Sequence, residues 1–246
     1  MDEKAVPGTG RRVSGTRVIA TVLGVFVGVS GLDHGLFEAL QGSVPTPGLF
    51  VHAIGPAQQM WRYGTEDALT VIPNFLVAGI VTIVVGLLTI VWSIWFIDRP
   101  RGPSGLLGLG ALLFLVGGGI AMLAFLVFGW AVARRIGRPI GWWRGIVPTP
   151  VATALASVWP WLLVLSVVLY AIALEIAIVG FVPGVSDPDL VLLVCWSALL
   201  AMFLVLVLAL IGASAAERDI GRHAGGRGVA PGPRSDDGRT SAATPS

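Results

Sequence analysis

Long apolar stretches alternate with short polar segments along this chain. Four stretches contain no Asp, Glu, Lys or Arg: residues 68–97, 102–133, 145–174 and 190–216. A helix needs about 20 apolar residues to cross the roughly 30 Å hydrocarbon core of a bilayer, and each stretch is longer than that. Stretches of this length are too long for sheet strands. The pattern therefore predicts an all-α integral membrane protein.

The N-terminal apolar segment differs from these four because its charge-free part, Val18–Leu32, is short for a membrane span. It becomes long enough if the helix continues to Gln41. An alternative is a signal peptide, with basic residues up to Arg17 and a small-residue cleavage site at Gly28–Ser30. We favour a first membrane span, because the stretch GLDHGLFEALQG that follows has no break and reads as helix.

These stretches and their polar boundaries define the predicted domain organisation. Residues 1–16 form a basic N-tail and residues 216–246 a C-tail without apolar periodicity, and we expect both to be disordered. Residues 17–215 form a single membrane domain of five long apolar helical segments, at about 17–41, 70–97, 104–133, 150–182 and 190–215.

The third segment contains Gly117-Gly118-Gly119 near its middle. Each glycine costs about 1 kcal/mol relative to alanine inside a helix, so three in a row favour a corner. Each arm of such a hairpin would be about 12 residues, or roughly 18 Å, and would reach mid-membrane. The segment is therefore predicted to be broken or re-entrant at Gly117–Gly119. A straight crossing with closely packed neighbours is the alternative.

The basic residues favour the hairpin. If the third segment returns to the side it entered from, fifteen of the sixteen Lys and Arg residues lie on one side, and only Arg62 lies on the other. Five crossings divide them ten to six, and a scheme in which the first segment does not cross divides them fourteen to two. Cytoplasmic loops concentrate Lys and Arg. The favoured scheme thus places both tails in the cytoplasm, and the Arg-, Ala- and Gly-rich composition indicates a bacterial cytoplasmic (plasma) membrane.

A few polar residues inside the apolar segments are candidates for a polar site. His34 and Glu38 are spaced i, i+4 on one helix face, with Asp33 beside them, and such a group can bind a cation or relay a proton. Glu175 lies about 12 Å deep in the fourth segment, where a carboxylate is costly, so we expect it to face protein. Asn74 lies near the start of the second segment. In the hairpin scheme all five share an outer-leaflet pocket; with five spans Glu175 lies at the opposite face.

Each of these residues also has a structural interpretation. The acidic and histidine group can simply mark the aqueous boundary, and Asn74 and Glu175 can hydrogen-bond between helices. No Ser-His-Asp or Cys-His arrangement is present, and the single Cys195 provides neither a disulfide nor a thiolate metal site. We therefore predict no catalytic residues, no metal and no cofactor.

Composition limits the function class. The chain is 55% hydrophobic and 12% charged with a net charge of +2, which reflects membrane topology rather than nucleic-acid binding. The favoured prediction is a non-enzymatic protein that acts in the lipid bilayer through lipid or protein partners, including a second copy of itself. The alternative is a small transporter or proton- or cation-coupled protein whose polar site is formed by the first, second and fourth segments.

Three motifs resemble a family of uncharacterised bacterial integral membrane proteins: GLDHGLFEALQG, IPNFLVAGI and VGGGI. The resemblance covers roughly residues 31–139 and implies a location rather than an activity. Where that family has prolines soon after the glycines, this chain has Ile120-Ala121-Met122. The matching positions are His34, Glu38, Pro73, Asn74 and Gly117–Gly119.

Overall fold

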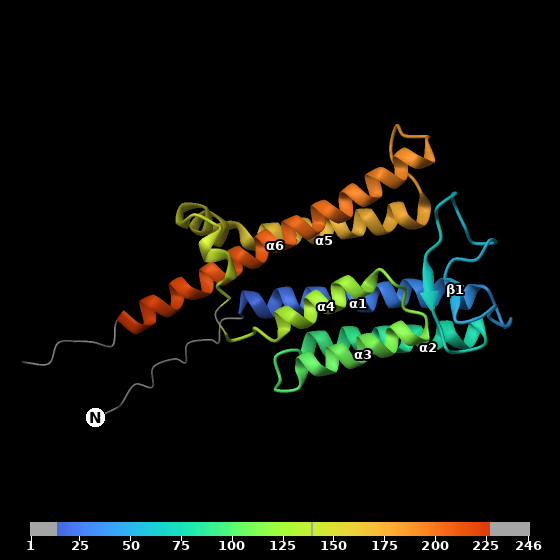
Figure 1. The fold of residues 1–246 in the computed structure, drawn as a ribbon, viewed down its shortest axis with the longest axis horizontal. Coiled ribbons are helices and arrows are strands. Elements are labelled where there is room, and N and C mark those ends of the chain that lie inside the picture. The colour runs from blue at the N-terminus through green and yellow to red at the C-terminus, as the bar shows by residue number, and fades with distance from the viewer. Residues whose placement is uncertain (1–13, 139, 227–246) are drawn as a thin grey trace, which may run out of the picture.

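The computed structural model describes residues 14–138 and 140–226 and is mostly helical (Figure 1). Four of its helices are long and apolar enough to cross a membrane, which corrects the prediction of five. These are α1 (Gly15–Leu40), α2 (Phe75–Trp95), α5 (Thr149–Val179) and α6 (Pro188–Gly226). The third predicted segment is instead divided into two short helices, α3 (Gly102–Val116) and α4 (Met122–Ala133).

Helices α3 and α4 form an antiparallel hairpin whose tip lies at the predicted glycines. Helix α3 ends at Gly117, whose φ of 131° is a left-handed conformation that favours glycine, and α4 begins at Met122. Both open ends of the hairpin lie at the end of the bundle where α1 begins (Figure 1). The tip lies near the other end, so the segment returns to the end from which it started.

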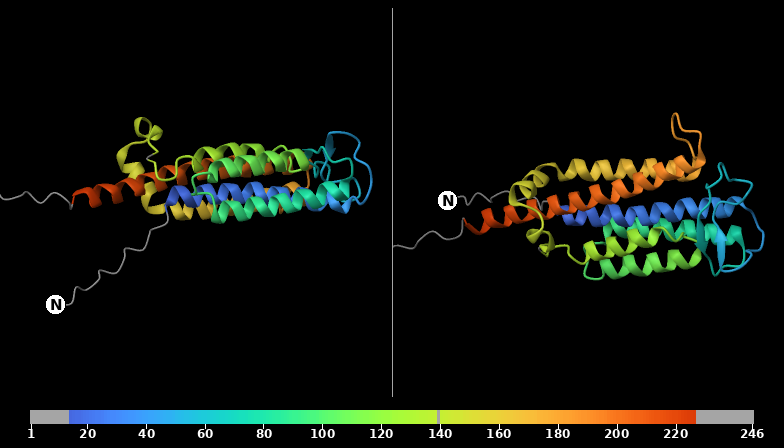
Figure 2. Two further views of the ribbon diagram at one scale, coloured as in Figure 1. Left: turned by 90° about the horizontal axis from the view of Figure 1, so that it is seen from below. Right: turned by 45° about the horizontal axis from the view of Figure 1, so that its top comes forward.

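Helix α1 is the centre of the bundle. It packs against α2 and α4, and it also contacts α6, while α5 and α6 pair with each other (Figure 2). Helices α1 and α2 approach closely at Gly35 and Gly79. A Cβ added to Gly35 would lie only 2.7 Å from the carbonyl oxygen of Gly79. Small residues at such positions let membrane helices approach closely.

The segment between α1 and α2 forms a cap over one end of the bundle. It contains a two-stranded antiparallel sheet of β1 (Phe50–His52) and β2 (Asp67–Leu69). The prediction of an all-α protein therefore needs this correction. Directly after β2, Thr70 pairs with Val116 at the end of α3 in an isolated antiparallel bridge. The cap therefore holds the hairpin tip in place.

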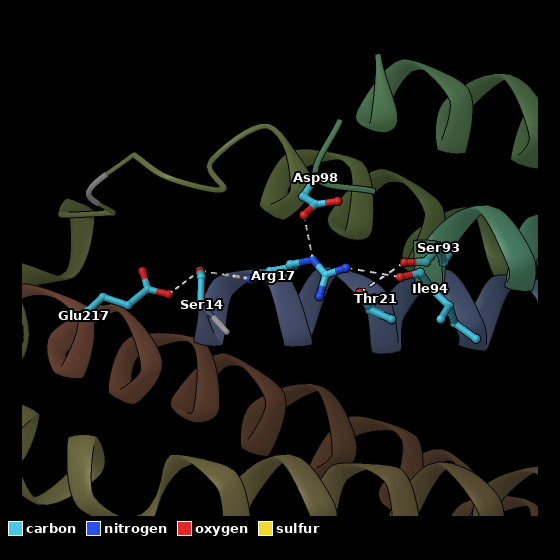
Figure 3. Close-up of polar contacts among 7 residues, drawn as sticks. All are labelled: Ser14, Arg17, Thr21, Ser93, Ile94, Asp98 and Glu217. Atoms are coloured by element: carbon cyan, nitrogen blue, oxygen red, sulfur yellow. Dashed lines mark hydrogen bonds and ion pairs between the residues drawn. The ribbon is translucent and has the colours of Figure 1, made fainter. Parts of the chain in front are cut away.

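Polar contacts join α1, α2 and α6 at the opposite end of the bundle (Figure 3). The Glu217 carboxylate of α6 accepts hydrogen bonds from Ser14 Oγ at 2.6 Å and from the Thr16 backbone N–H at 2.9 Å. A carboxylate is favourable there because the N-terminal end of a helix carries partial positive charge. Arg17 of α1 forms an ion pair with Asp98, which follows α2, at 3.0 Å. This cluster fixes where α1 begins.

The connection between α4 and α5 contains one turn of 3₁₀-helix, η1 (Trp142–Gly145). Trp143 is buried, and its Nε1 donates a hydrogen bond to Ser214 Oγ of α6 at 2.8 Å. Helix α6 continues to Gly226, beyond residue 215 where the membrane domain was predicted to end. The other residues of the predicted tails, 1–13 and 227–246, lie outside the described residues.

Large apolar side chains are exposed along the outer faces of the long helices. Burying such surface in lipid rather than in water is favourable by roughly 25 cal/mol per Å², so these faces suit contact with the lipid bilayer. The most exposed among them on α5 and α6 are Trp161, Val164, Leu193, Trp196, Leu200 and Leu204.

Candidate functional site

The C-terminal half of α1 buries two of the predicted polar residues. His34 and Glu38 are one turn apart on the same face, and they are 2% and 0% exposed. The His34 ring meets a partner from the cap, because its Nε2 lies 2.9 Å from Oε2 of Glu66. An ionised carboxylate only accepts hydrogen bonds, so Nε2 carries a proton, and Nδ1 is left without a partner among the described residues.

Glu66 lies directly before β2 and is held ionised by its neighbours. Burial on its own raises the pKa of the Glu66 carboxyl, but the hydrogen bond from His34, the charge of that ring and the backbone N–H of Ala121 together hold the pKa below its usual value. Ala121 directly precedes α4. The hairpin tip therefore contributes a donor to this group, as expected of a helix N-terminus near a negative charge.

Glu38 packs against the other side of the hairpin tip. A Cβ added to Gly117 would lie 2.4 Å from both of its carboxyl oxygens, so only a glycine leaves room for this side chain. Neither oxygen has a hydrogen-bond partner within residues 14–138 and 140–226. Nearby, Thr82 of α2 donates its hydroxyl to the Val116 carbonyl at 2.7 Å and so ties α2 to the end of α3.

A cavity of about 220 Å³ extends from this group between α1, α4, α5, α6 and the cap. Its polar end is formed by Asp33, His34 and Glu66, and no Lys or Arg lines it. Trp196 lines the cavity and is also 63% exposed on α6, so the cavity reaches the outer surface of the bundle there. Its aromatic lining residues are Phe37, Trp61, Tyr63, Phe125, Tyr170 and Trp196.

Aromatic and polar contacts join the walls of the cavity. Tyr170 of α5 stacks on Phe26 of α1 with ring centroids 4.1 Å apart, and its hydroxyl donates to the Phe26 carbonyl at 3.3 Å. Trp61 of the cap donates its Nε1 to the Ala177 carbonyl of α5 at 2.9 Å. These contacts connect the α5–α6 pair to the rest of the molecule around the cavity.

The structure gathers only part of the predicted polar site. Asp33, His34 and Glu38 lie together at the hairpin tip, while Asn74 accepts a hydrogen bond from the Val77 N–H and caps α2. Glu175 was expected to face protein, but its side chain is exposed on the outer face of α5 and does not line the cavity. The shared pocket of all five residues therefore does not form. Ligand binding by the residues that are gathered stays a prediction.

Glu66 and Tyr170 are site residues that the sequence analysis did not identify. One signal pointed to Glu66, because Glu66 and Asp67 are the only acidic residues between α1 and α2. Nothing in the pattern distinguished Tyr170 from the other apolar positions of its segment. Within the described residues, no group of three or more His, Cys, Asp or Glu side chains is arranged to hold a metal ion.

No protein family, curated protein or solved structure matches the chain. The resemblance to uncharacterised bacterial membrane proteins therefore stays a prediction. What the fold and the apolar helices define is a class, a multi-pass membrane protein in contact with the lipid bilayer.

Proposed function

We propose that this protein is a non-enzymatic membrane protein that binds an amphiphilic small molecule, such as a lipid, in the cavity beside α1. The observation that carries this proposal is the shape and polarity of the cavity. One end holds Asp33, His34 and Glu66, and most of the remaining wall consists of aromatic and aliphatic side chains of α1, the cap, α4, α5 and α6. Binding sites typically combine a large apolar wall with a few convergent polar groups.

The proposed topology has four crossings, a re-entrant α3–α4 hairpin and both tails in the cytoplasm of a bacterial cell. It is supported by the return of the hairpin to its starting end and by the division of the basic residues, with Arg62 alone on the outer side. The polar end of the cavity then lies in the outer leaflet, beneath the cap.

Topology is tested with single cysteines at exposed positions on either side of the hairpin. In a Cys195→Ala background, Ser104→Cys places a thiol in the first turn of α3 and Arg138→Cys places one after α4. A membrane-impermeant thiol reagent is expected to label both positions in inverted vesicles and neither in intact cells. Labelling of the two positions from opposite sides would show that the segment crosses.

Binding is tested at Cys195, which lines the cavity and is the single cysteine of the chain. The measurement is the rate at which methyl methanethiosulfonate modifies this thiol in phosphatidylcholine nanodiscs, followed by mass spectrometry. An amphiphile that occupies the cavity is expected to slow the reaction. The control is Leu193→Cys in the Cys195→Ala background, because position 193 is 61% exposed on the outer face of α6. Equal slowing at both positions would mean partitioning into lipid, with no binding site.

A second candidate function is proton- or cation-coupled transport, which one observation favours. Glu38 is fully buried without a hydrogen-bond partner, and ionisable groups at such depth in membrane proteins often belong to proton or ion pathways. The test is proton or cation flux in proteoliposomes with wild-type protein and the Glu38→Gln variant. Flux that is absent, or that is unchanged in the variant, would exclude this candidate.

A further inference from the structure

The polar end of the cavity has an unbalanced charge. Asp33 and Glu66 line it together with one histidine, and none of the other lining residues is basic. Even when His34 is protonated, two carboxylates face one positive charge, so the end is net negative. Charge complementarity at a binding site favours the oppositely charged partner and disfavours a like-charged one.

The same end also presents hydrogen-bond acceptors that lack donors. Within the described part of the chain, neither oxygen of Asp33 takes part in a hydrogen bond or an ion pair, although the residue is half-buried. His34 lines the cavity, is 2% exposed, and has an Nδ1 without a partner. That nitrogen is enclosed by protein, so the acceptors that face the cavity are the carboxylate oxygens of Asp33 and Glu66.

The apolar part of the cavity fits the body of such a ligand. Phe125, Tyr170 and Trp196 line it, and aromatic faces attract cations as well as apolar groups. Cys195 lies in a small apolar cluster with Ile176 and Val191 between α5 and α6. An alkyl chain that starts at Asp33 and runs toward α6 would therefore stay on apolar surface.

We propose that the cavity selects amphiphilic cations of the primary alkylammonium class, with the ammonium group between Asp33 and Glu66 and the alkyl chain between α5 and α6. This inference rests on the proposed binding function and specifies its ligand class. A primary ammonium group has three N–H donors, and the carboxylate oxygens of Asp33 and Glu66 can accept them. An anionic amphiphile would meet two carboxylates, and a neutral one would leave the charge at the polar end unbalanced.

The test compares three probes of equal chain length, octylammonium, octanol and octanoate, in the Cys195 protection assay. Octylammonium is expected to protect at concentrations on the order of tenfold lower than octanol, and octanoate is expected to protect least, because the carboxylates act on charge at short range. Asp33→Asn is expected to remove most of this preference. Within the described residues that variant removes no hydrogen bond or ion pair and keeps nearly the same side-chain volume, so its effect on binding is separable from unfolding.

Glu175→Gln is the matched control, because it removes one carboxylate from the exposed face of α5, away from the cavity. The preference for octylammonium is expected to persist in it. Equal protection by octylammonium and octanol, or a preference that survives both Asp33→Asn and Glu66→Gln, would overturn the cation assignment while leaving amphiphile binding in place. Failure of all three probes to protect Cys195 beyond the Leu193→Cys control would overturn the binding function itself.

Discussion

The substitution Gly117→Ala tests the hairpin tip most directly. Gly117 ends α3 with φ 131°, and a Cβ at this position would lie 2.4 Å from each carboxyl oxygen of Glu38. Carbon and oxygen atoms do not approach this closely without a bond. Either the tip or the Glu38 side chain has to move, and Glu38 is fully buried, so its movement would disturb the packing around it.

Two costs add to give the expected loss of stability in Gly117→Ala. A residue with a Cβ in a glycine-only backbone conformation costs about 1–3 kcal/mol. Inserting a methyl group into packed surroundings costs about 1–3 kcal/mol more. We expect Gly117→Ala to lower the free energy of unfolding by about 2–6 kcal/mol, which is a large part of the stability of a typical domain.

The assay is unfolding by sodium dodecyl sulfate in mixed micelles, followed by tryptophan fluorescence. Gly108→Ala is the control, because Gly108 lies within the same α3 helix and a Cβ added there has nothing within 4 Å. Alanine is the better helix former by about 1 kcal/mol, so this control is expected to be neutral or stabilising. Unfolding of Gly117→Ala at the same detergent fraction as Gly108→Ala would refute the packing of Glu38 against the tip.

Three further predictions concern other contacts of the bundle. Thr82→Val is expected to cost about 1 kcal/mol in the same unfolding assay, because it removes one buried hydrogen bond to the Val116 carbonyl. That carbonyl still accepts a hydrogen bond from the Thr70 hydroxyl, so it is not left without a donor. Glu217→Gln is expected to destabilise by about 1 kcal/mol because a charge leaves the N-terminal end of α1, whereas Glu175→Gln leaves the unfolding midpoint unchanged. The pKa of Glu66 is lowered in the folded protein from 4.5, so its contribution to stability is present above that value and is lost as the pH falls through the folded pKa. As the pH falls below 4.5, the wild type should lose stability faster than Glu66→Gln, and parallel curves of unfolding free energy against pH would contradict the pairing of Glu66 with His34.

The helices themselves follow from the sequence because their causes are local. Apolar stretches and the three consecutive glycines determine the conformation of the residues next to them. The position of the break in the third segment could therefore be predicted. The count of spans could not be read from hydrophobicity alone, since the segment at 104–133 is long enough to cross. The division of basic residues gave the independent argument for a hairpin, even though the prolines typical of the resembling family are absent.

The candidate site follows from the sequence only where its residues share one helix. His34 and Glu38 were predicted together because helical spacing places them on one face. Glu66 comes to His34 only through the folding of the cap, and its place depends on pairing between β1 and β2 that apolar patterning does not specify. Glu175 shows the opposite case, because the sequence places it in the fourth segment but does not specify which face of that helix it occupies. In the structure α5 ends at Val179, and the Glu175 side chain is exposed.

The break in the third segment links the fold to the chemistry of the site. In a continuous helix the backbone N–H and C=O groups beside α1 would be hydrogen-bonded to each other. The hairpin instead places the C-terminal end of α3 and the N-terminal end of α4, which carry opposite partial charges, inside the bundle. The C-terminal end of α3 lies at Glu38, where its partial negative charge disfavours an ionised carboxylate. The N-terminal end of α4 lies at Glu66, where its backbone N–H donor favours one. Half-helix ends of this kind form the substrate and ion sites of many carriers. The three glycines therefore create the electrostatic difference between a buried, uncompensated Glu38 and an ionised Glu66 facing the cavity, and substitution of Gly117 should disturb both.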